Sequence, residues 1–149
     1  MFYVERFAAY AATFEKAFES GDFSLLEPHF TEDAVYDVGT TLLGPAVEGR
    51  EAIFAHFDAS TRGFDKCFET RTLNRLEGPT EKGDSVWIHG SVIYSAAGVP
   101  DLVLDLEETA YFDGDRIERL EDRYTKEMEE KFLQYVDDYG KKLGFSIGG

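Results

Sequence analysis

The stretch DLVLDLEETAYFDGDRIERLEDRY, residues 101–124, alternates apolar and polar side chains on both sides of the dipeptide Asp113-Gly114. A period of two on either side of a Gly-containing turn predicts two antiparallel strands joined by a tight hairpin. We expect an odd-length loop with Gly114 in the left-handed conformation, which pairs even-numbered residues with even-numbered residues. A strict two-residue Asp113-Gly114 loop would reverse this parity, so the loop length decides which side chains share a face.

Even-numbered pairing gathers a mostly apolar set of side chains on one face of the hairpin. That face carries Leu104, Leu106, Glu108, Ala110 and Phe112 opposite Arg116, Glu118, Leu120, Asp122 and Tyr124. The odd-numbered face is more polar and carries Val103, Asp105, Glu107, Thr109 and Tyr111 opposite Ile117, Arg119, Glu121 and Arg123. We therefore expect the even-numbered face to pack against the helices of the protein.

Two carboxyl groups, those of Glu108 and Asp122, lie on the face that is predicted to be buried. Burial disfavours the charged form of a carboxyl group, so it raises the pKa and allows one of the two to remain protonated near neutral pH. Such groups suit general acid and base chemistry. Two alternatives stay open: either carboxylate pairs with Arg116 or Arg123 at an end of the sheet, or it is exposed at the rim.

The rest of the chain predicts further strands before this hairpin and helices at both ends. Runs of β-type sequence cover residues 34–38, 66–76 and 85–94, in addition to 101–112 and 116–124, with Gly- and Pro-containing separators at 78–83 and 98–100. Helical spacing of apolar residues indicates four helices, over 7–18, 23–30, 50–62 and 128–139. In the same order, the signals that end them are Gly21, residues 31–33, Gly63 and Gly140. Asp22 is placed to cap the second helix, and short connections make the last three strands an antiparallel meander.

Runs of helices followed by runs of strands are typical of an α+β fold. We expect a single domain, residues 1–149, in which three N-terminal helices pack on one face of a curved antiparallel sheet. An extra helix follows at the C-terminus. The curved face of such a sheet would enclose a pocket.

The composition excludes several classes of protein. With 30 acidic and 15 basic side chains the net charge is −15, which repels nucleic-acid phosphates and anionic membrane surfaces. The single cysteine, Cys67, cannot form an internal disulfide and indicates a cytoplasmic protein. No apolar stretch approaches the ~20 residues of a membrane span. The histidines, His29, His56 and His89, lack metal-ligand spacing, so we expect neither a metal nor a cofactor.

Four local strings, taken in order, extend the interpretation from fold class to family. They are SGD at 20–22, FTEDAV at 30–35, GREAI at 49–53 and YFDGDRI at 111–117. Together they resemble the superfamily of nuclear transport factor 2, ketosteroid isomerase, limonene epoxide hydrolase and the SnoaL-type polyketide cyclases. The resemblance implies a cystatin-like cone. It implies no single reaction, because this fold hosts isomerases, hydrolases, dehydratases, cyclases and non-catalytic binding domains.

The catalytic positions of these relatives are only partly filled. The hydrogen-bonding tyrosine, the aspartate base and the protonated aspartic acid of ketosteroid isomerases correspond to Phe14, Val38 and Glu108. The water-holding tyrosine and one catalytic aspartate of limonene epoxide hydrolase correspond to Tyr36 and Asp122. The Arg-x-Asp element of that hydrolase falls on the sequence GSV at 90–92. Neither catalytic set is therefore complete.

The leading hypothesis is a cofactor-independent enzyme that acts by proton transfer on a small, mostly apolar carbonyl, enol or epoxide-type substrate. Asp122 would be the base or acid, Glu108 would donate to or stabilise an oxyanion, and Tyr36 would supply an orienting hydrogen bond. The substrate-binding wall would be formed by Phe14, Val38, Phe57, Leu106 and Leu120. The competing hypothesis is a non-catalytic domain of the same fold that binds a small ligand or another protein.

The outer face of the predicted sheet would expose an apolar patch formed by Trp87, Ile93, Val103 and Tyr111. We expect a homodimer through this face, as the resemblance implies. Asp37 alternates to the face opposite Tyr36, so we place it outside the site. His89 shares a strand face with Trp87, and the sequence leaves open whether that face lines the pocket or lies outside.

Overall fold

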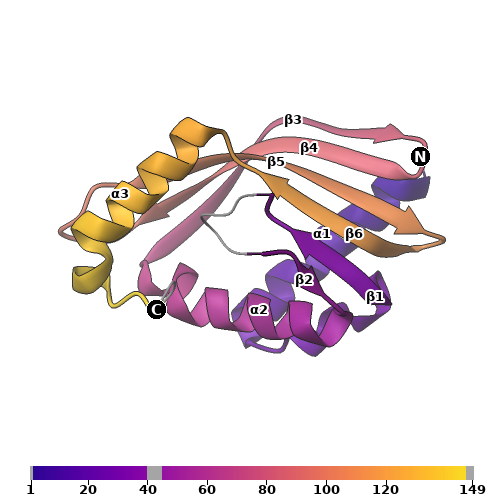
Figure 1. Ribbon diagram of the computed structural model, residues 1–149, viewed down its shortest axis with the longest axis horizontal. Coiled ribbons are helices and arrows are strands. Elements are labelled where there is room, and N and C mark those ends of the chain that lie inside the picture. Colours follow the sequence, from indigo (N-terminus) through magenta and orange to yellow (C-terminus); the bar gives the residue numbers. More distant parts are fainter. Residues whose placement is uncertain (1, 40–44, 147–149) are drawn as a thin grey trace.

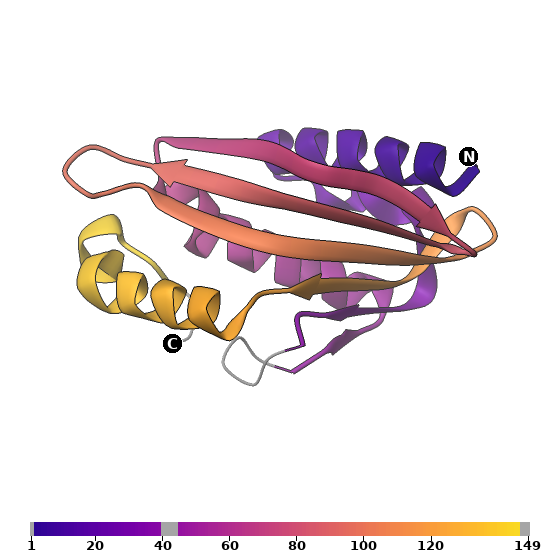
Figure 2. The same cartoon turned by 90° about the horizontal axis from the view of Figure 1, so that it is seen from above.

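The computed structural model describes residues 2–39 and 45–146, and these build helices against one six-stranded, curved sheet (Figure 1). In chain order the elements are α1 (Phe2–Ser20), η1 (Phe23–His29), β1 (Phe30–Asp37), β2 (Val47–Glu48), α2 (Arg50–Gly63), η2 (Asp65–Cys67), β3 (Thr70–Lys82), β4 (Ser85–Ser95), β5 (Leu102–Asp113), β6 (Arg116–Arg123) and α3 (Lys126–Leu143). The sheet order is β2-β1-β6-β5-β4-β3. Helices α1 and α2 lie under the same face of the sheet, and α3 lies at one end (Figures 1 and 2). The predicted α+β fold is confirmed.

The helix boundaries follow local signals at most ends. Gly21 has a φ of 78° directly after α1, and the Asp22 carboxylate accepts a hydrogen bond from the Ser24 amide, as predicted for a cap. The prediction that Gly140 ends the last helix is wrong, because α3 continues to Leu143 and Gly144 adopts the left-handed cap. A Cβ at Gly140 would lie only 3.0 Å from the Phe145 ring, so a glycine there allows the C-terminal segment to pack closely on α3.

Strand β3 differs most from its predicted range. It begins at Thr70, because residues 65–67 form η2, and it continues through the predicted separator 78–83 to Lys82. Two register shifts, between Arg75 and Glu77 and between Glu77 and Thr80, absorb the Gly-Pro dipeptide. The meander therefore includes four antiparallel strands, β3 to β6. By contrast, β1 pairs parallel with β6, which makes the sheet mixed.

The last hairpin reaches the predicted pairing by an unpredicted route. Its turn has two residues, Gly114 and Asp115, between the paired Asp113 and Arg116, and a register shift follows between Tyr111 and Phe112. The shift restores even-numbered pairing farther along, so Glu108 and Asp122 share a face, as predicted, and lie directly opposite each other.

Near the turn the predicted faces are wrong. Ile117 is fully buried and pairs with Phe112, whereas Arg116 and Glu118 are exposed. The physical reason is the bulge, which places two residues of β6 against one of β5 and so reverses the alternation on its turn side.

Two apolar clusters lie under the sheet. The first joins α1, η1, α2 and the sheet around Phe30, Leu26 and Ile53, all with 0% exposure. The second joins the two residues that flank η2, Phe64 and Phe68, to β4, β5 and α3 around Leu102 and Tyr135. Among the described helices, none is long and apolar enough to cross a membrane.

Candidate functional site

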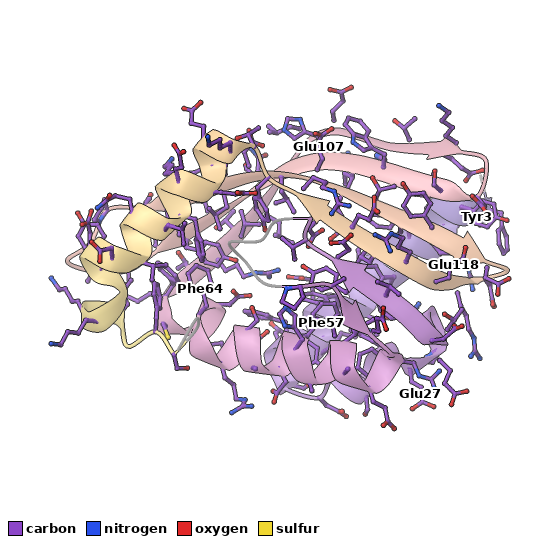
Figure 3. All side chains as sticks on the ribbon, in the orientation of Figure 1. Tyr3, Glu27, Phe57, Phe64, Glu107 and Glu118 are labelled. Atoms are coloured by element: carbon purple, nitrogen blue, oxygen red, sulfur yellow. The ribbon has the colours of Figure 1, made fainter. Side chains whose placement is uncertain are left out.

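A cavity of about 1010 Å³ lies between the helices and the inner face of the sheet. Residues of both apolar clusters line its wall, including Phe57 of the first cluster and Phe64 of the second. Figure 3 shows these two phenylalanines between α2 and the sheet. The volume is at the upper end of small-molecule pockets. All eight residues that the sequence placed in a site line this one cavity: Phe14, Tyr36, Val38, Phe57, Leu106, Glu108, Leu120 and Asp122.

Glu108 and Asp122, here called the carboxyl pair, lie directly opposite each other on β5 and β6. Asp122 is 7% exposed, and the Tyr36 hydroxyl donates a hydrogen bond of 2.5 Å to its Oδ2. Tyr36 reaches Asp122 because β1 runs beside β6 with Tyr36 opposite Leu120. The Oδ1 atom of Asp122 is buried, and no hydrogen-bond partner for it is found among residues 2–39 and 45–146.

The electrostatics of the pair differ from those of exposed carboxylates. Burial raises the pKa of Glu108 well above its usual range, and the negative charge of Asp122 raises it further. Burial, followed by the charge of Asp122, also raises the pKa of Tyr36. The shift of Glu108 favours its protonated form, and Tyr36 keeps its hydroxyl proton at neutral pH. Two proton-bearing groups thus face one buried carboxylate at the wall of an apolar cavity.

Neither of the alternatives left open for Asp122 holds. The Arg123 guanidinium forms its ion pairs with Asp37 and Glu121 on the outer face, and it reaches only the backbone carbonyl of Asp122, not its carboxylate. Asp37 lies on that outer face, as predicted from strand alternation, and its pKa is lowered by the Gly39 amide and then by Arg123 and Arg119.

The side chain of His89 also lies on the outer face of the sheet. The sequence had left open which face carries it. Its Nε2 lies 2.8 Å from Asp105 Oδ1, and the neighbouring Trp87 indole donates to Glu107, which Figure 3 shows on the outer side of the sheet. His89 is therefore no part of the cavity wall.

Two aromatic residues near the carboxyl pair were missed as site residues. His56 lines the cavity with its ring centroid 5.6 Å from that of Tyr36, and burial lowers its pKa. Tyr124 also lines the cavity, and burial raises its pKa. A signal for His56 was present in the sequence, because His56 is three residues from Ile53 and adjoins Phe57 on the predicted helical stripe.

A second polar group, here called the remote polar group, consists of Asp65, Arg71, Glu15 and Tyr94. Arg71 lies 2.9 Å from Glu15 Oε1 and 3.9 Å from Asp65 Oδ2, and its guanidinium lies over the Phe18 ring at 4.4 Å. Burial raises the pKa of Asp65 to about 6. No sequence signal marked this group, since its members come from four separate elements.

The described residues contain no group of three or more His, Cys, Asp or Glu side chains placed to hold a metal ion. What the cavity offers is a half-buried proton donor, a buried carboxylate and a long apolar wall. This arrangement can bind a largely apolar molecule and exchange a proton with it.

Comparison with known proteins places this architecture in a family. The family model of the SnoaL-like domain matches residues 10–119. No curated protein matches the sequence. Among solved structures that share the fold, an NTF2-like protein of unknown function from Burkholderia pseudomallei has 14% sequence identity and a TM-score of 0.66, and the match covers 87% of this chain and 95% of that one. A putative SnoaL-like polyketide cyclase from Shewanella denitrificans has 19% identity and a TM-score of 0.63, with coverage of 85% and 96%. A Mycobacterium tuberculosis protein in complex with estradiol-17β-hemisuccinate has 15% identity and a TM-score of 0.61, with coverage of 81% and 95%. The chain belongs to the SnoaL-like domain family.

Proposed function

We propose that the chain is a cofactor-independent enzyme that binds a small, largely apolar carbonyl, enol or epoxide-type substrate in the cavity and moves a proton on it. The reaction would be of the isomerase, cyclase, dehydratase or hydrolase type. The carboxyl pair carries this proposal, because Glu108, whose pKa is raised by burial, and a Tyr36-bound Asp122 share the wall of an apolar cavity. The estradiol derivative bound by the Mycobacterium tuberculosis protein supports a small apolar ligand.

The mechanism assigns one role to each polar group. In the proposed resting state Glu108, directly opposite on β5, donates its proton to Asp122 Oδ1, for which the described residues show no hydrogen-bond partner. A substrate oxygen that takes over this proton, by hydrogen bond or by transfer, leaves Asp122 Oδ1 free to accept a proton. Asp122 then accepts a proton from the substrate or from an attacking water, while the Tyr36 hydroxyl holds it in place.

The second candidate function is a non-catalytic ligand-binding or protein-association domain. The positions that correspond to the donor tyrosine and the aspartate base of ketosteroid isomerases are Phe14 and Val38, and both line the cavity as apolar side chains. Such a domain would bind the same molecules and leave them unchanged.

The two functions differ in proton exchange. The protein is incubated in D₂O with a panel of small cyclic ketones and enones, and deuterium incorporation next to the carbonyl is followed by mass spectrometry. The enzymatic proposal expects incorporation above the buffer rate with at least one compound and its loss in Asp122→Asn. Tight binding of these compounds without exchange, isomerisation or hydration would favour the binding domain.

We also propose a homodimer that buries the outer sheet face. Trp87, Ile93, Val103 and Tyr111 are half-buried there, and Ile93 pairs with Val103 across β4 and β5. Such a patch is typical of interaction surfaces. The free Cys67 and the net charge of −15 support a cytoplasmic location and argue against a nucleic-acid partner.

The dimer is tested by sedimentation. The wild type is expected to sediment at twice the 16.8 kDa of one chain, and Ile93→Asp at 16.8 kDa, because two buried, unpaired charges oppose association. Leu25→Asp is the matched control, since Leu25 is an exposed leucine on η1 away from the sheet. A monomeric wild type, or an Ile93→Asp variant that stays dimeric, would contradict the proposed interface.

A further inference from the structure

The remote polar group lies in the same cavity as the carboxyl pair but well away from it along the sheet. Glu108 is in register with Ile88 on β4, and Tyr94 is six residues farther along that strand. Six residues of extended chain span about 20 Å of backbone. The Tyr94 hydroxyl donates to Asp65 Oδ1 at 3.3 Å, so Asp65 belongs to this far end.

The wall between the two polar groups is apolar on the inner face. Leu106 and Leu104 are the inward-facing residues of β5 between Glu108 and the far end, and both line the cavity. Tyr124 also lines the cavity and packs against the second apolar cluster, to which Tyr94 belongs. A ligand that reaches both groups is therefore elongated and apolar in its middle part.

Asp65 is held firmly and retains hydrogen-bonding capacity. Its side chain is 15% exposed, and Tyr94 fixes Oδ1. The Nε atom of Arg71 lies 3.9 Å from Oδ2, which is too long for a hydrogen bond. Within the described ranges, no other donor to Oδ2 is found, so this oxygen can accept from a ligand in the cavity.

The charges of the remote polar group determine whether an anionic or a hydroxyl-bearing end of a ligand can bind there. Arg71 lies between two carboxyl groups, Glu15 at 2.9 Å and Asp65 at 3.9 Å, so an anionic ligand end would meet two acidic side chains around a single cation. The Asp65 carboxylate repels a carboxylate or phosphate and accepts from a hydroxyl. Burial raises the pKa of Asp65 to about 6, which leaves it mainly ionised at pH 7.5 and a strong acceptor there.

We propose that Asp65 is a second substrate-anchoring residue, which accepts a hydrogen bond from a hydroxyl group at the far end of an elongated, otherwise apolar substrate. This inference rests on the proposed function, since it takes the reacting end of the substrate to lie at the carboxyl pair. Tyr94 acts as a positioning residue that orients Asp65. The substrate class is thereby narrowed to molecules with an oxygen function at each end.

The test compares 4,4′-dihydroxystilbene with 4-hydroxystilbene, which differ in one terminal hydroxyl and are both fluorescent. At pH 7.5 the wild type is expected to bind the diol about tenfold or more tightly than the mono-ol, the effect of one hydrogen bond to a charged acceptor. Asp65→Leu is expected to reduce this ratio to about one, because leucine has similar volume and no acceptor. Tyr94→Phe, which keeps the ring, is expected to reduce it by a smaller factor.

The controls separate this inference from the proposed function. Asp58→Leu, at a partly exposed aspartate on α2 that does not line the cavity, should keep the wild-type ratio. The anchoring role would be overturned if the wild type showed no preference for the diol. It would also be overturned if Asp65→Leu and Tyr94→Phe both kept the wild-type preference. If Asp65→Leu removes the preference while Asp122→Asn retains full proton exchange, the anchor stands and the proposed chemistry fails.

Discussion

The variant Asp122→Asn is expected to lower kcat/KM for proton transfer by roughly 10²–10⁴-fold, the usual contribution of a positioned acid or base. Asparagine keeps the shape of the side chain and can still accept from the Tyr36 hydroxyl, so the cavity wall stays intact. It cannot take up a proton at neutral pH, and its amide group replaces the carboxylate opposite Glu108. The loss is measured as the rate of deuterium exchange or turnover on the compound identified in the D₂O panel.

The matched control for this variant is Glu121→Gln, which changes the preceding carboxylate on the opposite face of β6. Glu121 pairs with Arg119 and Arg123 and does not line the cavity, so the rate should stay within twofold of the wild type, roughly the effect of a surface charge. Tyr36→Phe should give an intermediate loss in kcat with little change in KM, because it removes only the hydrogen bond that positions Asp122. Full turnover in Asp122→Asn would remove Asp122 from the mechanism.

The variant Glu108→Gln is expected to make the protein more stable at neutral pH while reducing its activity. The folded state raises the pKa of Glu108 well above its ordinary value of 4.5, so it holds a proton that the unfolded chain releases. Each unit of this difference costs the wild type about 1.4 kcal/mol of unfolding free energy once both pKa values are exceeded. Glutamine avoids that cost, and its amide can donate to Asp122 as the protonated carboxyl does. It cannot transfer a proton to substrate.

The sign of the pH dependence follows from the number of bound protons. Below pH 4 Glu108 is protonated in both states, so it adds no pH-dependent difference between variant and wild type. As the pH rises through 4.5, the unfolded state loses the proton first, and the wild type becomes progressively less stable relative to Glu108→Gln. Urea unfolding at pH 4, 6 and 8 measures this difference. Glu107→Gln, on the opposite face of the same strand, is the control and should show no such trend.

An equal stability difference at all three pH values would contradict the assignment of a buried, protonated Glu108. So would a variant that loses stability more at pH 8 than at pH 4. A gain in stability combined with unchanged proton exchange would leave the burial of Glu108 intact and remove its catalytic role. The pair of measurements therefore separates the environment of Glu108 from its function, as expected where a site is maintained at a cost in stability.

The pairing of Glu108 with Asp122 shows how sequence and structure divide the information. Alternation over residues 101–124 placed both carboxyl groups on the more apolar face, because a period of two is a property of any extended strand. The bulge between the turn and the pair was not visible locally. Its position depends on which side chains the neighbouring strand and helices bury, and this is why Ile117 lies inside and Glu118 outside.

The sequence by itself determined the α+β class, most helix ends, the meander and the residues that line the cavity beside the carboxyl pair. These features arise from periodicity and glycine conformation, which act over a few residues. Only the tertiary structure decided that β1 lies parallel to β6, which brings the Tyr36 hydroxyl to Asp122 across 86 positions of chain. It also decided that Glu15, Asp65, Arg71 and Tyr94 meet at the far end of the same cavity. Contacts of this kind come from packing helices under a curved sheet, and no local pattern encodes which distant side chains that packing brings together.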